Sequence, residues 1–167
     1  MKLKICESSY SQELKDAIFA YTAQGGNLAY KYPFDMYKTK TLKDALYSNK
    51  IKLDCNIYRG IWMSEKQWEK VFYNWYEEKH EPFNMSVFNS FTKDKRRAHG
   101  YGNGGDFFVL LVLEKGTTIH ALELWEDSMY PEEEEVLVAN DTFYIKNIEF
   151  SEHSGYSTIV YLTNKRV

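Results

Sequence analysis

The chain has 167 residues, about the length of one domain, and 44% of them are hydrophobic, which is enough to form a core. Its 17% aromatic content, three prolines and nine glycines exclude a disordered, collagenous or low-complexity protein. With 21 basic and 24 acidic residues the net charge is −3, so nucleic acid and anionic membranes are not expected partners. We expect a single domain spanning residues 1–167 that acts as a monomer.

The longest apolar run, residues 107–113, is far shorter than the roughly 20 residues needed to cross a bilayer. The first fifteen residues turn polar too early for a secretory signal peptide. The four histidines and two cysteines show no metal-ligand spacing, so no metal is expected. We interpret Cys6 and Cys55 as free thiols, with a bridge between them as the alternative in an oxidising compartment.

Three helices are predicted, each from a capping residue followed by apolar residues at helical spacing. The first has Ser9 and Gln12 as its capping pair and stops at Gly25, and the second lies around residues 41–46. The third runs from Ser64 to before Pro82 and carries the stripe Trp68, Val71, Phe72 and Trp75. We interpret this stripe as core packing rather than as a cofactor site.

Seven strands are predicted from apolar runs and alternation, at residues 53–60, 83–92, 107–113, 118–124, 134–138, 142–150 and 158–162. The wholly apolar run 107–113 is expected to be a central strand that is buried on both faces. Turn residues at 115–116 and 140–141 predict antiparallel neighbours. The C-terminal half is therefore predicted to be a meander with the helices packed in front of it, in an α+β fold.

One arginine falls on the inward row of a predicted strand. By period two, Leu53, Cys55 and Ile57 point inward, and Arg59 continues that row. An unpartnered buried guanidinium costs several kcal/mol, so Arg59 must meet a carboxylate or a bound anion. A structural salt bridge to a glutamate and an anion site are both open on this evidence.

Four consecutive glutamates, residues 132–135, lead into the apolar strand 136–138. In extended chain Glu133 and Glu135 would project to one face and Glu132 and Glu134 to the other. The pattern is typical of a solvated acidic loop, yet it also presents two acids together at the start of a strand. A calcium loop is disfavoured because no glycine-punctuated Asp/Asn pattern accompanies the acids.

Two hydroxyl residues flank Phe91 at the end of another predicted strand. Ser90 and Thr92 share one face of that strand. Residues 93–97, which are basic except for Asp94, and the glycine-dense residues 100–105 follow. The basic cluster is a weak nucleic-acid signal in an acidic protein. A loop that folds over a phosphate accounts better for the glycines.

In this order the motifs resemble the arginine–serine–glutamate class of ADP-ribosyltransferases. The matching segments are Tyr58-Arg59-Gly60, Ser90-Phe91-Thr92 in place of Ser-Thr-Ser, and Glu133 to Leu137 as Glu-x-Glu followed by a Val-Leu strand. Residues 20–22 and 27–28 are similar to the N-terminal helical segment of the family. Phe91 departs from the pattern, where the family has a small residue, and is expected to alter the rim of the site.

The resemblance implies an ADP-ribosyltransferase-like fold of two roughly perpendicular, mainly antiparallel sheets, with NAD in the cleft between them and N-terminal helices against them. It implies NAD as co-substrate, bound by Arg59, Gly60, Ser90, Thr92 and Glu135. Breaking the nicotinamide bond develops positive charge on the ribose, which Glu135 would stabilise while Ser90 orients it. From position alone, Arg96 or Arg97 would add a phosphate contact and Tyr101 would stack on nicotinamide.

Glu133 is implied to decide the acceptor, because a protonated arginine needs a second carboxylate to orient it before it attacks. The resemblance therefore implies arginine-specific mono-ADP-ribosylation of a target protein. Trp125, Met129 and Tyr130 would contact that protein. A secreted or injected effector or toxin domain is the expected setting.

Three alternatives remain open. An NAD glycohydrolase would use the same residues with water as acceptor, and a binding relative could have kept the fold and lost catalysis, which only Phe91 favours. A glycosidase using the paired glutamates is also compatible with their spacing, although it leaves Arg59 unexplained.

Overall fold

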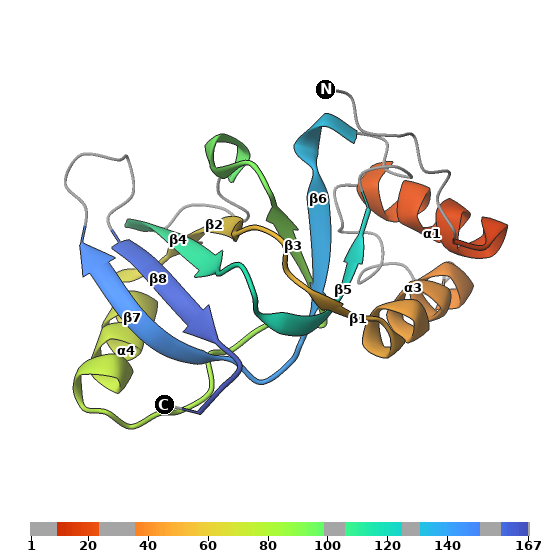
Figure 1. Cartoon of the computed structure of the whole chain (residues 1–167). Helices are drawn as coiled ribbons and strands as arrows, with labels where there is room; N and C mark the ends of the chain where they lie inside the picture. Colours follow the sequence, from red (N-terminus) through yellow and green to blue (C-terminus); the bar gives the residue numbers. More distant parts are fainter. Residues whose placement is uncertain (1–9, 24–35, 99–105, 125–130, 151–157, 167) are drawn as a thin grey trace.

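The computed structural model describes residues 10–23, 36–98, 106–124, 131–150 and 158–166. Its helices are α1 (Gln12–Ala23), α3 (Met36–Ser48) and α4 (Glu65–Tyr76), with short 3-10 turns η2 (Lys95–Arg97) and η3 (Pro131–Glu133). Its strands are β1 (Lys50–Lys52), β2 (Ile57–Met63), β3 (Phe88–Thr92), β4 (Phe107–Leu113), β5 (Thr118–Glu123), β6 (Glu135–Ala139), β7 (Tyr144–Phe150) and β8 (Thr158–Thr163) (Figure 1). The predicted α+β class is confirmed. Every helix in these segments is too short or too polar to cross a lipid bilayer.

The eight strands form one curled sheet in the order β1-β5-β6-β3-β2-β4-β8-β7. Its weakest link lies between β2 and β3, which share only the pair Tyr58 and Thr92, whereas β2 shares seven pairs with β4 and β3 shares five with β6. The sheet is therefore two four-stranded halves joined at one point, and the strands of the two halves run in different directions (Figure 1). Among the described strands only β4 and β8 pair in parallel, so the sheet is mainly antiparallel, as expected.

β4 is the central strand that its apolar run predicts, with the predicted bounds. It lies between β2 and β8, and residues Val109 to Leu113 are buried. The meander prediction is wrong, because neither β5 pairs with β4 nor β7 with β6. Both turn segments instead carry the chain to another part of the sheet.

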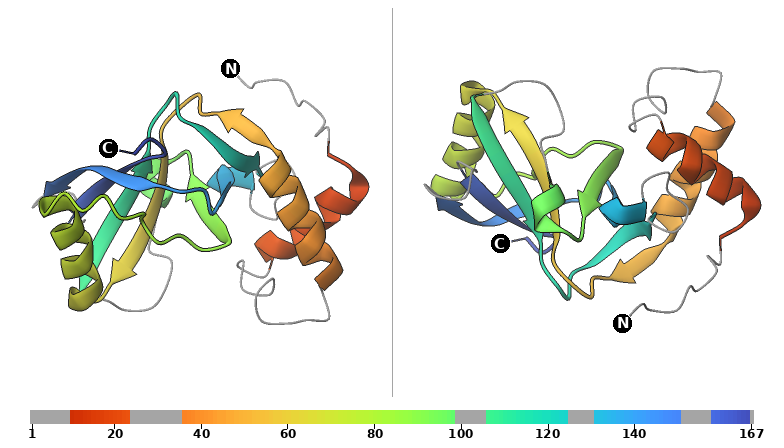
Figure 2. Two further views of the ribbon diagram at one scale, coloured as in Figure 1. Left: turned by 90° about the horizontal axis from the view of Figure 1, so that it is seen from below. Right: turned by 90° about the horizontal axis from the view of Figure 1, so that it is seen from above.

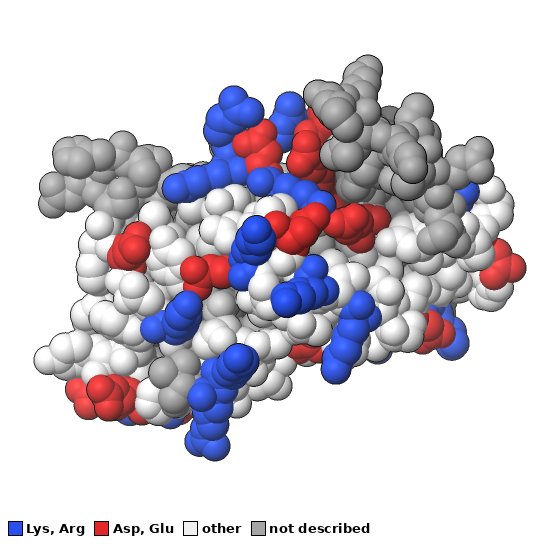
Figure 3. All heavy atoms as spheres, in the orientation of Figure 1, with Lys and Arg blue, Asp and Glu red and all other residues white. Residues whose placement is uncertain are grey.

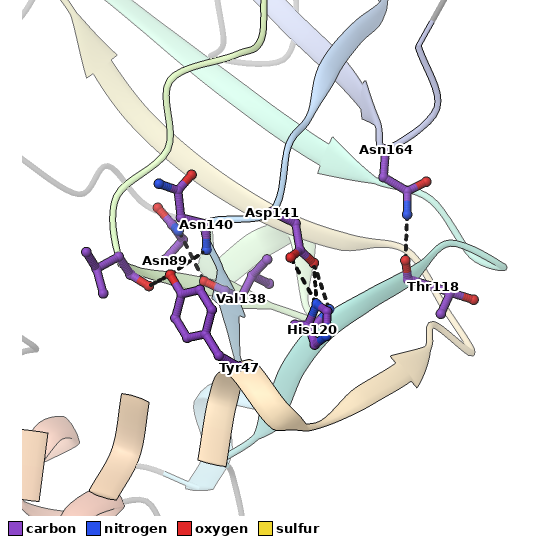
Figure 4. Close-up of polar contacts among 9 residues, drawn as sticks. Tyr47, Asn89, Thr118, His120, Val138, Asn140, Asp141 and Asn164 are labelled. Carbon is purple, nitrogen blue, oxygen red and sulfur yellow. Dashed lines mark hydrogen bonds and ion pairs between the residues drawn. The ribbon is translucent and has the colours of Figure 1, made fainter. Parts of the chain in front are cut away.

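Hydrogen bonds at these two turns explain the difference. The turn at Gly116, whose φ is +92°, bonds to the segment before β2: Gly116 N donates to Leu53 O at 2.8 Å, and Leu53 N donates to Thr117 O at 2.9 Å. At the other turn, the Asp141 carboxylate accepts from His120 N at 2.8 Å and contacts His120 Nδ1 at 3.0 Å (Figure 4). One connection is anchored to the segment between β1 and β2 and the other to β5, so neither closes a hairpin.

α1 and α3 pack on each other and cover one face of the half-sheet formed by β1, β5, β6 and β3 (Figure 2). The predicted stripe of α1 is buried there, consisting of Leu14, Ala17, Ile18 and Tyr21. The cap differs from the prediction: Ser11, not Ser9, accepts from Leu14 N at 3.2 Å, and Ser9 and Gly25 lie outside the described residues. α3 begins at Met36, several residues before the predicted segment.

α4 lies against β7 and β2 at the other end of the molecule (Figure 2). Its predicted capping box is confirmed: Ser64 Oγ accepts from Gln67 N, and Gln67 Oε1 accepts from Ser64 N. Its stripe contacts the core but none of its residues is fully buried, because α4 lies at the edge of the sheet. The prediction that this stripe packs in the core is therefore only partly correct.

Two strands begin four or five residues later than predicted. The row from Leu53 through Cys55 to Arg59 is interrupted, because the chain turns between β1 and β2 and the strand begins only at Ile57. In the predicted strand 83–92, the Asn89 side chain bonds to both backbone groups of Ser86, in place of a neighbouring strand. Only β3 is regular strand there.

Gly60 on β2 lies directly under the segment that follows η2. A Cβ added at Gly60 would be 2.1 Å from the carbonyl oxygen of Ala98 and 2.8 Å from the Phe108 ring. Because the nearest atom belongs to backbone, it cannot swing aside as a side chain would. A glycine at this position lets the chain after β3 cross β2 closely.

We predict that Gly60→Ala lowers the free energy of unfolding by about 3 kcal/mol, at the upper end of the range for overpacking. Gly116→Ala is the matched control, because its Cβ has open space and only its positive φ is strained, costing about 1 kcal/mol. Urea denaturation of both variants measures the difference. Equal losses would mean that the crossing near Ala98 relaxes freely.

Candidate active site

Ser90 and Glu135 lie on neighbouring strands, on the same face of the sheet. Thr92 pairs with Glu135 and Ser90 with Leu137, so side-chain alternation places Ser90, Thr92 and Glu135 on one side. Their exposed fractions are 7%, 3% and 7%. Ser90 Oγ donates a hydrogen bond to Glu135 Oε2 at 3.3 Å. A carboxylate and a hydroxyl thus meet in a nearly buried setting, where electrostatic interactions are stronger than in water.

Arg59 lies beside this pair, at the point where the two half-sheets separate. Its Nη1 donates to the backbone carbonyl of Ser90 at 2.9 Å, and its side chain is half-buried. The bond joins β2 to β3 next to the single backbone pair between Tyr58 and Thr92. The structure therefore links Arg59 to Ser90 through the backbone and Ser90 to Glu135 through its side chain, and we call these three residues the Arg59–Ser90–Glu135 cluster.

Tyr21 adds a hydroxyl that the sequence analysis does not assign to the site. Its OH lies 3.0 Å from Ser90 Oγ in a buried hydrogen bond. Its ring packs edge-on against Phe88, with centroids 5.7 Å apart. A tyrosine on the buried stripe of a helix is the signal that could have revealed it, because a buried tyrosine OH needs a polar partner.

Phe91, the departure from the family pattern, does not lie at the rim of the site. It points to the opposite face of β3 from Ser90, is fully buried, and belongs to the core cluster of Leu111, Val136 and Val138. The expectation that it alters the rim is wrong, because alternation along the strand turns it into the core.

The four glutamates do not form extended chain. Residues up to Glu133 form η3, Glu134 N donates to Pro131 O at 3.1 Å, and Glu134 has a φ of +46°. The predicted alternation of Glu133 and Glu135 to one face is therefore wrong, because regular strand begins only at Glu135. A turn, rather than strand geometry, sets the relation of Glu133 to Glu135.

Charged side chains surround the end of β3 (Figure 3). Lys93 Nζ lies 2.7 Å from Glu123 and 3.8 Å from Asp54. Desolvation, the largest single influence, lowers the pKa of Lys93, but the hydrogen bond and charge of Glu123 together with Asp54 outweigh it and raise that pKa above its usual value. Lys93 is therefore held as a cation between two carboxylates.

η2 presents its arginines to solvent. Arg96 Nε and Nη2 both donate to Asp94 at 3.2 Å, and Arg97 Nε lies 3.6 Å from the same carboxylate. The hydrogen bonds from Arg96, followed by the charges of both arginines, lower the pKa of Asp94. The side chain of Arg96 is 91% exposed, so its predicted phosphate contact stays a prediction.

Thr92 is placed beside the cluster, and its Oγ1 accepts from Asp94 N at 3.1 Å. Tyr101, Trp125, Met129, Tyr130 and Cys6 lie outside the described residues, and of Glu133 only the backbone is described. Cys55 is a free, half-buried thiol whose pKa is raised by burial and by its hydrogen bond with Asp54. Within the described segments no group of His, Cys, Asp and Glu side chains could hold a metal ion.

A cavity of about 290 Å³ lies elsewhere, between the C-terminal end of α4 and β7. Its lining includes Asn74, Trp75, His80 and Lys146 and none of the cluster residues. It offers neither a buried carboxylate nor a guanidinium. The convergence of Arg59, Ser90 and Glu135 therefore defines the candidate site better than the shape of this cavity does.

No protein-family profile matches the sequence, and no curated protein matches it. Solved structures match the fold. The ADP-ribosyltransferase Vis from Vibrio splendidus gives a TM-score of 0.62 at 19% identity, over 93% of this chain and 74% of Vis. C3stau2 of S. aureus, solved with NAD, gives 0.58 at 15% identity, over 95% of this chain and 89% of C3stau2.

The ADP-ribosyltransferase HopU1 of Pseudomonas syringae pv. Tomato DC3000 gives a TM-score of 0.51 at 16% identity, over 77% of this chain. This chain spans about half of HopU1, 51% of its length. At these identities the likenesses concern the fold. The chain has the ADP-ribosyltransferase fold, as its three motifs predict.

We predict that Arg59→Met, which keeps the length of the side chain and removes its donors, lowers the free energy of unfolding by about 1–3 kcal/mol. The loss arises because Ser90 O loses its charged donor beside the weakest seam of the sheet. Arg96→Met is the control, and its exposed side chain should leave stability nearly unchanged. Chemical denaturation compares the two, and similar losses would show that Arg59 does not join β2 to β3.

Proposed function

We propose that this chain transfers ADP-ribose from NAD to an arginine side chain of a target protein and releases nicotinamide. The observation that carries the proposal is the Arg59–Ser90–Glu135 cluster: a nearly buried carboxylate accepts from a serine hydroxyl, and the backbone carbonyl of the same serine accepts from a half-buried guanidinium. These are the groups that the three sequence motifs supply, and the chain has the fold of enzymes of this class. We propose that residues 1–167 form one catalytic domain of a secreted or injected effector or toxin.

The residues fit a dinucleotide chemically. Cleavage of the nicotinamide N-glycosidic bond develops positive charge on the ribose, and a carboxylate in a poorly hydrated place stabilises such charge strongly. We assign this role to Glu135, and Ser90 orients it. Arg59 is assigned to the NAD phosphates, which guanidinium groups bind through paired N–H donors.

Gly60 and Thr92 are assigned to NAD binding with Arg96 and Tyr101. The structure of C3stau2 with NAD supports NAD as the co-substrate. No metal has a role in this proposal. Each of these assignments concerns binding and orientation rather than a covalent step by the protein.

Glu133 is assigned to the acceptor, with Trp125 and Tyr130 contacting the target protein. A protonated guanidinium is a poor nucleophile, so a carboxylate must orient it and help to remove a proton. Vis has been solved with agmatine, a small molecule that carries a guanidinium group, which supports an acceptor of this chemistry. Water as acceptor, which would make the chain an NAD glycohydrolase, is the second candidate. An inactive relative loses its main support, because Phe91 is a core residue.

We predict that Glu135→Gln lowers both NAD cleavage and ADP-ribose transfer by roughly 100- to 1,000-fold, because the charge that stabilises the ribose is lost. Glu133→Gln is expected to lower transfer to agmatine by about 100-fold and to leave NAD cleavage within a few-fold of wild type. Nicotinamide release and labelled agmatine report the two activities separately.

Glu134→Gln is the matched control, because Glu134 is exposed and adjoins both residues. It should retain both activities. Undiminished transfer by Glu133→Gln would refute the role of Glu133, and a wild type that releases nicotinamide but modifies no guanidinium would favour the glycohydrolase.

A further inference from the structure

We propose that Tyr21 is a positioning residue of the active site, which acts on Glu135 through Ser90. The inference rests on the proposed function and adds a residue from α1, a helix outside the three motifs. Three side chains form a continuous hydrogen-bonded chain: Tyr21 OH lies 3.0 Å from Ser90 Oγ, and Ser90 Oγ lies 3.3 Å from Glu135 Oε2.

The protons that each group can donate set the direction of these two hydrogen bonds. A hydroxyl has one proton to donate, and an ionised carboxylate can only accept. Ser90 donates its proton to Glu135, so its oxygen must accept from Tyr21. Tyr21 thus donates to Ser90, which donates to Glu135. Hydrogen bonds in series polarise one another, so the tyrosine strengthens the donation that Glu135 receives.

The packing of α1 fixes the tyrosine that begins this chain. Tyr21 is 7% exposed and belongs to the same buried cluster as Leu137 and Phe88. Phe88 and Ser90 share one face of β3, two residues apart, so the ring packs on Phe88 while the hydroxyl reaches Ser90. The apolar contacts of the helix therefore determine where a polar group is placed in the site.

This arrangement matters because the Ser90–Glu135 contact is long. At 3.3 Å it exceeds the usual length of about 2.7–2.8 Å for O–H···O bonds. A serine hydroxyl rotates freely unless a second partner holds it. Tyr21 supplies that partner and prevents Ser90 from turning its proton away from Glu135. Preorganisation of this kind acts on turnover rather than on substrate binding.

The test is a double-mutant cycle with Tyr21→Phe, Ser90→Ala and the combined variant, assayed for nicotinamide release. Tyr21→Phe keeps the ring against Phe88 and removes only the hydroxyl. We expect its kcat to fall about 5- to 20-fold with KM for NAD within about 2-fold of wild type. In the Ser90→Ala background the same change should alter kcat less than about 2-fold, because the relay is already broken.

Tyr47→Phe is the matched control. Tyr47 lies on α3, and its hydroxyl donates to Val87 O and accepts from Asn140 N, each at 3.0 Å, away from the cluster (Figure 4). It should lower the melting temperature and leave kcat unchanged. An effect of stability alone would lower kcat in both tyrosine variants alike.

Two results would overturn the inference while the proposed function stands: wild-type kcat in Tyr21→Phe, or an equal loss from Tyr21→Phe with and without Ser90. A wild type that releases no nicotinamide would instead refute the proposed function. Melting temperatures of wild type and the three variants of the cycle then test the hydrogen bond between Tyr21 and Ser90. Non-additive losses would support it and additive losses would contradict it.

Discussion

The structure depends on keeping a carboxylate nearly buried at the junction of two half-sheets. An isolated buried charge is costly, so Glu135 requires donors around it. Ser90 supplies one from the neighbouring strand, and the guanidinium of Arg59 donates to the backbone carbonyl of Ser90. Ser90 and Glu135 meet across the regular pairing of β3 with β6, whereas the Arg59 side chain reaches Ser90 O where β2 and β3 separate after a single pair. The seam that weakens the sheet is thus also where Arg59 reaches Ser90.

Several surrounding elements stabilise the junction between β2 and β3. Gly60 lets the chain after η2 cross β2 closely, so η2 is held next to β2. Lys93, between Glu123 and Asp54, ties the end of β3 to β5 and to the turn before β2. α1 and α3 cover the same face farther along and add the Tyr21 hydroxyl. The contacts that stabilise this junction therefore lie around the residues to which we assign the chemistry.

Local patterns predicted well where a single element decides the outcome. The apolar run of β4, the capping box at Ser64 and the buried stripe of α1 follow from short-range spacing, and all three are confirmed. Predictions that depend on which other element a segment pairs with failed more often. The turns at 115–116 and 140–141 look like hairpins, yet bonds to Leu53 and from His120 direct the chain to other strands. The acidic run looked extended, yet a 3-10 turn occupies its first half and Glu134 has a positive φ.

By itself the sequence determined the fold class, the order of the motifs and the identity of Arg59, Ser90 and Glu135 as the residues to consider, since these depend on residue type and period. Only the tertiary structure decided that Phe91 belongs to the core, that Tyr21 reaches Ser90, and that Arg59 bonds to Ser90 O at the seam. The reason is physical: strand register and helix packing join residues about 30 to 70 positions apart, and no local spacing encodes which of them will meet.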